Sequence, residues 1–156
     1  MTAGSSRDWN EFIASLLDRR VRFIIVGAHA LAALGRPRYT GDLDVFVEPI
    51  RPNIARLRAA LADFGAPTSE GIFELAGGDR MLTIGREPVR IDIMTGISGV
   101  TFEEAWRGRA RHRLGGRLVN FLGRTEYLKN KRASAVNPRR TAKDLADIAL
   151  LEEVEE

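Results

Sequence analysis

The chain carries the run Asp42-Leu43-Asp44-Val45-Phe46-Val47, in which two acidic side chains alternate with apolar ones before an apolar end. This pattern predicts a β-strand that begins at the aspartates and stops before Glu48-Pro49, because proline interrupts regular strand pairing. Successive side chains of a strand point to opposite faces, so Asp42 and Asp44 share one face while the intervening leucine and valine face the core. Their Cα atoms are then roughly 6 to 7 Å apart, and both carboxylates can bind one hard cation.

A third aspartate lies in a second apolar run, Val89-Arg90-Ile91-Asp92-Ile93-Met94. This run predicts another strand, in which apolar neighbours on both sides make an unpaired charge on Asp92 costly. If this strand lies beside the strand of Asp42, three carboxylates converge on the oxygen-rich kind of site that magnesium prefers. The structural alternatives are a salt bridge from Asp92 to Arg90 or another arginine, and a capping or turn role for the Asp-x-Asp pair.

The rest of the chain predicts strands and helices in alternation. Apolar spacing, glycines and prolines predict helices over residues 9–17, 28–34, 52–64, 101–107, 128–133 and 142–154. They predict strands over residues 21–26, 42–47, 72–75, 81–84, 89–94, 109–114 and 117–121. Thr101 with Glu104 has the form of a capping box, and Gly115-Gly116 predicts the turn of a hairpin. Interleaved strands and helices indicate an α/β or α+β sandwich.

Size and composition predict one compact domain. The chain has 156 residues, of which 44% are hydrophobic. We expect residues 1–156 to form a single domain, with an α/β core to about residue 122 and C-terminal helices over about 123–156. The absence of cysteine excludes disulfides and thiolate-bound zinc. Because the apolar runs are short and the first residues lack a signal pattern, we expect a cytoplasmic protein that does not enter a membrane.

Charge is distributed unevenly along the chain. The formal net charge is only +3, but arginines crowd the stretch from Arg107 to Arg140 and the last residues are acidic. A basic stretch fits an anionic partner such as RNA. The alternative is that these arginines solvate strand and helix faces. The same alternative, a solvated helix pair held by ion pairs, applies to the charged side chains Lys131, Lys143, Asp144 and Asp147.

Gly27 follows a strand and opens a helix, so its backbone can approach phosphate oxygens. A strand ending in glycine, a helix, an Asp-x-Asp strand and a later strand aspartate occur here in the order that resembles the nucleotidyltransferase superfamily. The chain is most similar to small bacterial members, the minimal nucleotidyltransferases and the abortive-infection, type IV toxin-antitoxin nucleotidyltransferase toxins. The stretches that carry the resemblance are Val26-Gly27-Ala28-His29-Ala30-Leu31, Arg38-Tyr39-Thr40-Gly41-Asp42-Leu43-Asp44, Arg90-Ile91-Asp92-Ile93-Met94, Asn130-Lys131-Arg132-Ala133 and Lys143-Asp144-Leu145-Ala146-Asp147.

The resemblance implies a nucleotidyltransferase-like mixed β-sheet flanked by helices. By position, it implies that Asp42 and Asp44 ligate Mg²⁺ or Mn²⁺ and that Asp92 completes the site as ligand or base. The implied reaction moves a nucleoside monophosphate from a nucleoside triphosphate to a hydroxyl of RNA (tRNA included), of a protein or of a small molecule. It also implies an antitoxin as a partner of a toxin-antitoxin toxin.

The resemblance further implies phosphate contacts from the Gly27 turn, Thr40, Lys131 and Lys143. The family's second turn residue is usually glycine or serine, whereas Ala28 offers only its backbone N–H. Separately, Arg36 and Arg38 immediately precede the carboxylates. Either arginine can hold a triphosphate or pair with an aspartate when no metal is bound.

Other functions and roles stay open on the sequence alone. Ala28 favours a catalytically degenerate nucleotidyltransferase fold that acts as a toxin-antitoxin or RNA-binding partner. A phosphatase of the haloacid dehalogenase type also carries Asp-x-Asp, but its nucleophile follows an apolar strand, whereas here the apolar run follows the aspartates. His29 either reaches a ligand or packs within the fold, and we expect His112 at the surface.

Overall fold

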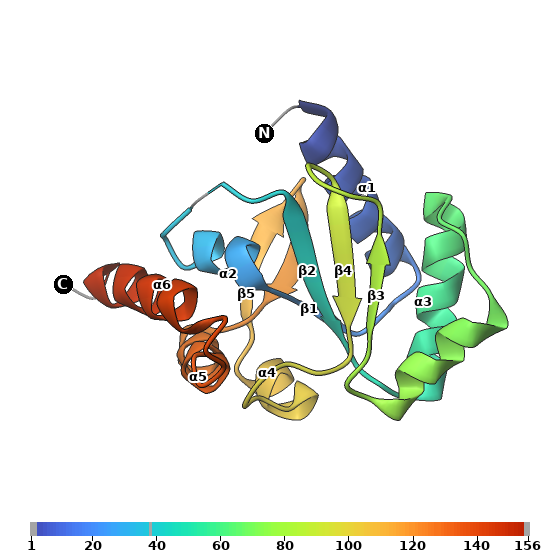
Figure 1. Ribbon diagram of the computed structural model, residues 1–156. Coiled ribbons are helices and arrows are strands. Elements are labelled where there is room, and N and C mark those ends of the chain that lie inside the picture. The colour runs from blue at the N-terminus through green and yellow to red at the C-terminus, as the bar shows by residue number, and fades with distance from the viewer. Residues whose placement is uncertain (1–2, 38, 155–156) are drawn as a thin grey trace.

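A mixed β-sheet forms the centre of the molecule. The computed structural model describes residues 3–37 and 39–154, which contain a sheet of six strands in the order β3-β4-β2-β1-β6-β5 (Figure 1). Its parallel pairs are β1 with β6 and β2 with β4, and its antiparallel pairs are β1 with β2, β3 with β4 and β5 with β6. The strands are β1 (Phe23–Val26), β2 (Asp42–Val47), β3 (Met81–Ile84), β4 (Arg90–Met94), β5 (Ala110–Leu114) and β6 (Arg117–Phe121).

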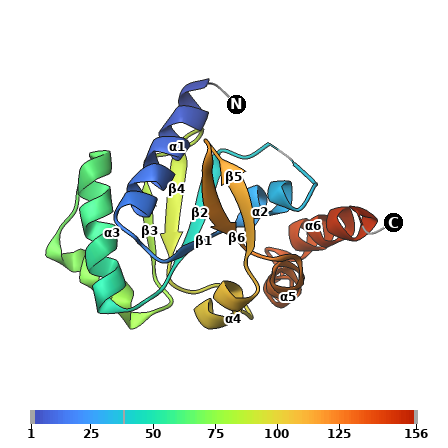
Figure 2. The same ribbon diagram turned by 180° about the vertical axis from the view of Figure 1, so that it is seen from behind.

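Helices cover both faces of the sheet. The helices are α1 (Ala3–Asp18), α2 (Gly27–Ala33), α3 (Arg51–Phe64), the 3-10 helix η1 (Glu70–Gly77), α4 (Phe102–Arg107), α5 (Arg124–Ser134) and α6 (Thr141–Val154). The helices α1, α3 and η1 pack their apolar side chains on one face, and α2, α4, α5 and α6 pack theirs on the other (Figures 1 and 2). The described residues therefore form an α/β sandwich of three layers. None of the helices described has the length and apolar character needed to cross a bilayer.

Strand alternation divides the core into the same two layers. Phe23 and Ile25 of β1 belong to the cluster under α1 and α3, whereas Ile24 and Val26 belong to the cluster under α2, α4, α5 and α6. In β2, Leu43 and its alternate neighbours Val45 and Val47 are buried in the first cluster. Asp42 and Asp44, which alternate with these residues, consequently face the second helical layer, where the candidate functional site lies.

Most of the predicted elements are confirmed, with bounds that match closely at β2, β3, β6 and α4. The capping box is present: the Glu104 N–H donates to Thr101 Oγ1 and the Thr101 N–H donates to Glu104 Oε1. The strand predicted over residues 72–75 is wrong, because this segment lies within the 3-10 helix η1. Ile72 and Leu75 are three residues apart and both buried, a spacing that places them on one side of a 3-10 helix.

One buried side chain fixes the start of α3 against the central strands. Asn53 is 0% exposed, and its Oδ1 accepts a hydrogen bond from the Arg22 N–H at 2.8 Å. Its Nδ2 donates to the carbonyl oxygens of Arg22 and Glu48, each at 3.0 Å. Three backbone groups at the ends of β1 and β2 thus depend on one amide, which links the first helical layer to the strand of the aspartates.

We expect Asn53→Leu to lower the free energy of unfolding by about 2–4 kcal/mol, because three partly buried backbone groups lose their hydrogen-bond partner. Urea denaturation followed by circular dichroism measures this loss. The matched control is Asn10→Leu on the exposed part of α1, which should change stability by less than about 0.5 kcal/mol. Equal effects of the two substitutions would contradict the proposed role of Asn53.

Candidate functional site

A cleft of about 910 Å³ lies on the sheet face covered by α2, α5 and α6. Acidic side chains on β2 and β4 line its sheet side, and cationic side chains on and next to α5 and α6 line the facing side. The charged residues that line it are Asp42, Asp44, Asp79, Arg90, Asp92, Lys131, Arg140 and Lys143. Because its facing walls carry opposite charges, this cleft suits a polyanionic ligand that itself carries bound cations.

The parallel pairing of β2 with β4 brings the three predicted aspartates into this cleft. Asp44 lies directly across from Asp92 in the register, and Asp42 lies across from Arg90. In neighbouring parallel strands, side chains at paired positions leave the same face of the sheet. The expectation that the strand of Asp92 lies beside the strand of Asp42 is therefore confirmed, and all three carboxylates line one cavity.

Arg90 neutralises the most buried of these carboxylates. Asp92 is 6% exposed, and its Oδ1 accepts hydrogen bonds from Arg90 Nε at 3.0 Å and from Thr83 Oγ1 at 2.8 Å. Arg90 Nε also lies 4.0 Å from Asp42 Oδ1. The salt bridge between Asp92 and Arg90, which the sequence left as an alternative to a metal role, is thus present.

The three carboxylates are arranged around this arginine rather than as a closed ligand cage. Within the described ranges, no group of three or more His, Cys, Asp or Glu side chains is spaced to hold a metal ion in this conformation. Two observations still fit a cation. Asp42 Oδ1 is buried and has no hydrogen-bond partner, and hard carboxylate oxygens are the donors that Mg²⁺ and Mn²⁺ take.

The closeness of the three carboxylates affects the pKa of Asp44. Burial, together with the nearby charges of Asp92 and Asp42, raises the pKa of Asp44 from 3.8 to about 6. Lys131 and Lys143 oppose this shift from the helices across the cleft. The ionised form of Asp44 is therefore held at an energetic cost near neutral pH, and any additional cation in the cleft lowers that cost.

Gly27 lies against Asp44 at the end of β1. Its φ of +68° is in the left-handed region, and a Cβ built there would lie 2.3 Å from Asp44 Oδ2. A glycine is required here both by backbone conformation and by the close approach of the carboxylate. This contact places the Gly27 backbone beside the acidic group, whereas the predicted contact of Gly27 with phosphate stays a prediction.

Two further side chains hold the first residue of β2. Thr40 Oγ1 accepts from the Asp42 N–H at 3.1 Å and donates to the Asp42 carbonyl at 3.1 Å. His29 packs edge-on against Trp9, burial lowers its pKa, and it hydrogen-bonds the Asp42 backbone. His29 therefore packs within the fold, and both side chains position Asp42.

Lys131 lies deep in the facing wall. It is 6% exposed, and its Nζ lies 3.5 Å from Asp144 Oδ1 and 3.3 Å from Asp147 Oδ2, both on α6. The helix pair held by ion pairs, considered from the sequence, is thus confirmed in its ion pairs but wrong in being solvated, because Lys131, Asp144 and Asp147 are all buried. Lys143, in contrast, is exposed and lines the cleft.

Several predicted site residues lie elsewhere or have other partners. Ala28 is 8% exposed and does not line the cleft, and neither does Thr40. Arg36 donates to the Leu150 carbonyl and pairs with Glu153 on α6, so it neither lines the cleft nor pairs with the aspartates. Arg38 lies outside the described residues.

Several residues that line the cleft or contact its aspartates had no site role in the sequence-based prediction. Arg90 was considered only as a partner of Asp92, although its position two residues earlier on the same strand already placed it on the same face. Thr83 comes from the neighbouring strand, and its contact depends on the antiparallel register of β3 with β4. Asn130, whose Nδ2 donates to the Ser98 carbonyl at 2.9 Å, lies in the helix predicted over residues 128–133, but it was given no site role there.

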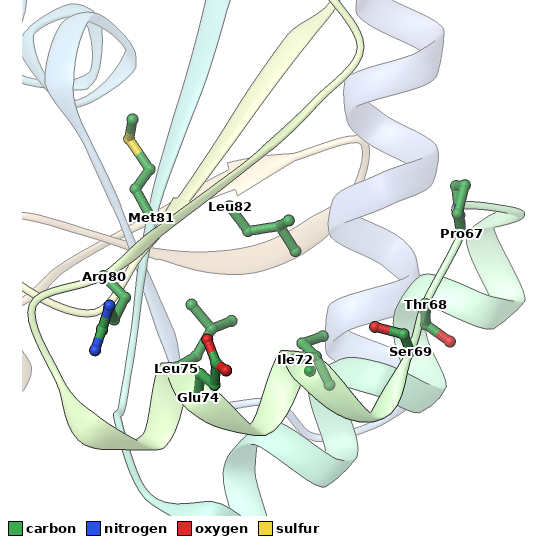
Figure 3. Close-up of a pocket in the computed structure, with 10 residues that line it drawn as sticks. Pro67, Thr68, Ser69, Ile72, Glu74, Leu75, Arg80, Met81 and Leu82 are labelled. Carbon is green, nitrogen blue, oxygen red and sulfur yellow. The ribbon is translucent and has the colours of Figure 1, made fainter.

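A second cavity, of about 440 Å³, lies on the other side of the edge strand β3. Figure 3 shows Ile72, Leu75 and Leu82 on its inner wall, whereas Met81 points to the opposite side of the strand. Met81 alone of the residues on β3 lines both cavities. The second cavity contains no pair of facing carboxylates, so the acidic cleft is the better candidate for phosphate chemistry.

Comparison with known proteins leaves the family open. No protein-family model matches the chain, and a search of curated proteins found no match.

We expect Asp44→Asn to stabilise the metal-free protein. Since folding raises the pKa of Asp44 from 3.8 to about 6, the ionised carboxylate destabilises the fold; this cost is absent below about pH 4 and complete above about pH 6. The substitution should therefore add about 1–2 kcal/mol at pH 8 in the presence of a chelator, and much less at pH 4. Urea titrations at both pH values measure the difference, and an effect independent of pH would contradict it.

We expect Gly27→Ala to lower the free energy of unfolding by about 2–3 kcal/mol, because it adds a contact with Asp44 to the strain of a positive φ. Gly115→Ala is the matched control: its φ is +60° but nothing lies within 4 Å of the added Cβ. The control should lose only about 1 kcal/mol. Equal losses in urea denaturation would show that the approach to Asp44 carries no cost.

Proposed function

We propose that this protein is a metal-dependent nucleotidyltransferase with a nucleotidyltransferase-like fold. The observation that carries the proposal is the register of β2 with β4, which sets Asp44 across from Asp92 and brings three carboxylates into one cleft with facing cations. The glycine at the end of β1 supports it, since it lies in contact with the Asp44 side chain.

In this proposal Asp42, Asp44 and Asp92 hold Mg²⁺ or Mn²⁺. The donor set fits, because it consists of carboxylate oxygens whose mutual repulsion a cation relieves. When bound, the ion would neutralise phosphate charge as the nucleotidyl group is transferred. The same cleft is wide enough for a nucleotide, whose phosphates would lie between the carboxylates and the cationic side chains of the facing wall.

The side chains of the chain itself bind the triphosphate and handle the proton. Lys131 and Lys143 lie across the cleft from the carboxylates and attract the phosphates. The hydroxyl oxygen of the acceptor bonds to the α-phosphorus, the bond between the α- and β-phosphates breaks, and pyrophosphate leaves. Asp92, whose Oδ1 is already engaged by Arg90 and Thr83, uses its other oxygen either to bind the ion or, as the base, to accept the hydroxyl proton.

The acceptor belongs to a hydroxyl-bearing class that includes RNA ends such as those of tRNA, protein side chains and small molecules. The arginine-rich stretch 107–140 supports RNA. We propose further that such an activity serves a toxin-antitoxin toxin in the cytoplasm, with an antitoxin as its partner. These assignments rest on the resemblance to small bacterial nucleotidyltransferases.

Transfer of label from each α-labelled nucleoside triphosphate, with Mg²⁺ or Mn²⁺, tests the proposal. Asp42→Asn and Asp92→Asn should each lower the rate at least about a hundredfold, since a lost metal ligand removes several kcal/mol of charge stabilisation. Asp63→Asn is the control, because Asp63 lies on the exposed surface of α3, in the other helical layer, where it pairs with Arg19. Transfer that survives both cleft substitutions would remove the proposed mechanism.

The alternative is a degenerate nucleotidyltransferase-like protein that binds without catalysis. The buried methyl group of Ala28, at the position where the family offers glycine or serine, favours it. Calorimetry with Mg²⁺ and nucleoside triphosphates separates the two. Metal-dependent nucleotide binding without transfer supports a binding protein, and absence of both supports a protein whose function lies in contacts with a partner.

A further inference from the structure

The acidic cleft contains a cation of its own in a position that sequence analysis did not assign to the site. Arg90 is two residues before Asp92 on β4 and lies across from Asp42 in the register with β2. Its guanidinium is consequently between two of the three carboxylates, with Nε 3.0 Å from Asp92 Oδ1 and 4.0 Å from Asp42 Oδ1. Within residues 3–37 and 39–154, Arg90 is the cation that pairs with Asp92 and with Asp42.

The contacts of Asp92 distinguish its two oxygens. Oδ1 accepts from both Arg90 Nε and the Thr83 hydroxyl, which fixes the rotation of the carboxylate. Asp92 itself lines the cleft. Oδ1 therefore holds the side chain in place, and Oδ2 is the oxygen that we assign to a ligand or proton.

Charge gives the second part of the argument. Three carboxylates within one cleft carry more negative charge than one divalent ion neutralises, and Arg90 supplies one positive charge at short range. Two-metal sites neutralise such a cluster with a second ion. Here the guanidinium of Arg90 already lies beside Asp42 and Asp92. Part of the negative charge is therefore neutralised without a second ion.

We propose that Arg90 is a positioning residue of this site: it fixes the Asp92 carboxylate through one oxygen and offsets charge that a second cation would otherwise neutralise. The inference rests on the proposed function, because it assigns a role at the same three carboxylates. It predicts two separable effects of Arg90, one on the orientation of Asp92 and one on the affinity of the cleft for divalent ions.

Mn²⁺ binding to the intact chain, measured by calorimetry and by the shift of Tm on adding Mn²⁺, tests the charge effect. Arg90→Gln should bind Mn²⁺ roughly tenfold more tightly than the parent and gain more Tm on Mn²⁺ addition, because a repelling charge is removed. Arg90→Lys keeps the charge and should stay within about threefold of the parent affinity. Arg19→Gln, which breaks an exposed ion pair with Asp63, should leave Mn²⁺ affinity unchanged.

Kinetics test the orientation effect. Both Arg90 variants should lower kcat at least about tenfold with little change in KM for the nucleotide, since Arg90 acts through Asp92 rather than on the triphosphate. A purely structural role would lower Tm without changing Mn²⁺ affinity, and that result overturns the inference. So does full kcat in Arg90→Lys. If Arg90→Gln does not fold, the lysine variant alone decides.

The two proposals fail in different ways. If the parent binds no Mn²⁺, or binds it equally well after Asp42→Asn, the proposed function fails. If the parent binds Mn²⁺ through Asp42 but Arg90→Gln binds it no more tightly, only the role of Arg90 is overturned.

Discussion

Repulsion among three carboxylates that share one face of the sheet is the constraint to which the rest of this structure responds. Its cost is visible at Asp44: burial and the neighbouring acids raise the pKa of this side chain to about 6. The fold offsets this cost with cations from every side: Arg90 within the sheet, and Lys131 and Lys143 on the helices opposite. A cluster so expensive to keep is better explained by a function than by stability, because apolar residues at these positions would cost less.

The C-terminal helices take part in the site because of a buried ion cluster. The buried ammonium group of Lys131 on α5 pairs with Asp144 and Asp147 of α6. Removing one partner of such a cluster leaves a buried charge without compensation. The pair of helices therefore places a cation opposite the aspartates with little freedom to move. A site wall built in this way is preorganised, which is what the proposed nucleotidyl transfer requires for electrostatic stabilisation.

Local sequence patterns predicted the structural features that are set by residues adjacent along the chain. The alternation in residues 42–47 and the capping box of Thr101 with Glu104 were sufficient to predict β2 and α4. The apolar run around Ile72 was misread as a strand. A segment this short and apolar shows no clear period that would distinguish a strand from a 3-10 helix. The burial of Lys131 and the contact of Thr83 with Asp92 depend on helix packing and strand register, which no local pattern encodes. The aspartates of the cleft and the pairing of Asp92 with Arg90 were predictable from the sequence, whereas the position of Arg90 between Asp92 and Asp42 depends on the register of β2 with β4.

The alternation of Asp42, Leu43 and Asp44 also bears on how the chain avoids misfolding. If β2 slipped by one residue against β1 and β4, both acids would enter the apolar layer under α1 and α3, and Leu43 would move into the cleft. Burying two unpaired carboxylates costs several kcal/mol each, so this misaligned sheet is strongly disfavoured. The acids thus disfavour an incorrect register of β2 while the sheet forms. Their replacement by neutral residues would widen the set of compact states that compete with the native one.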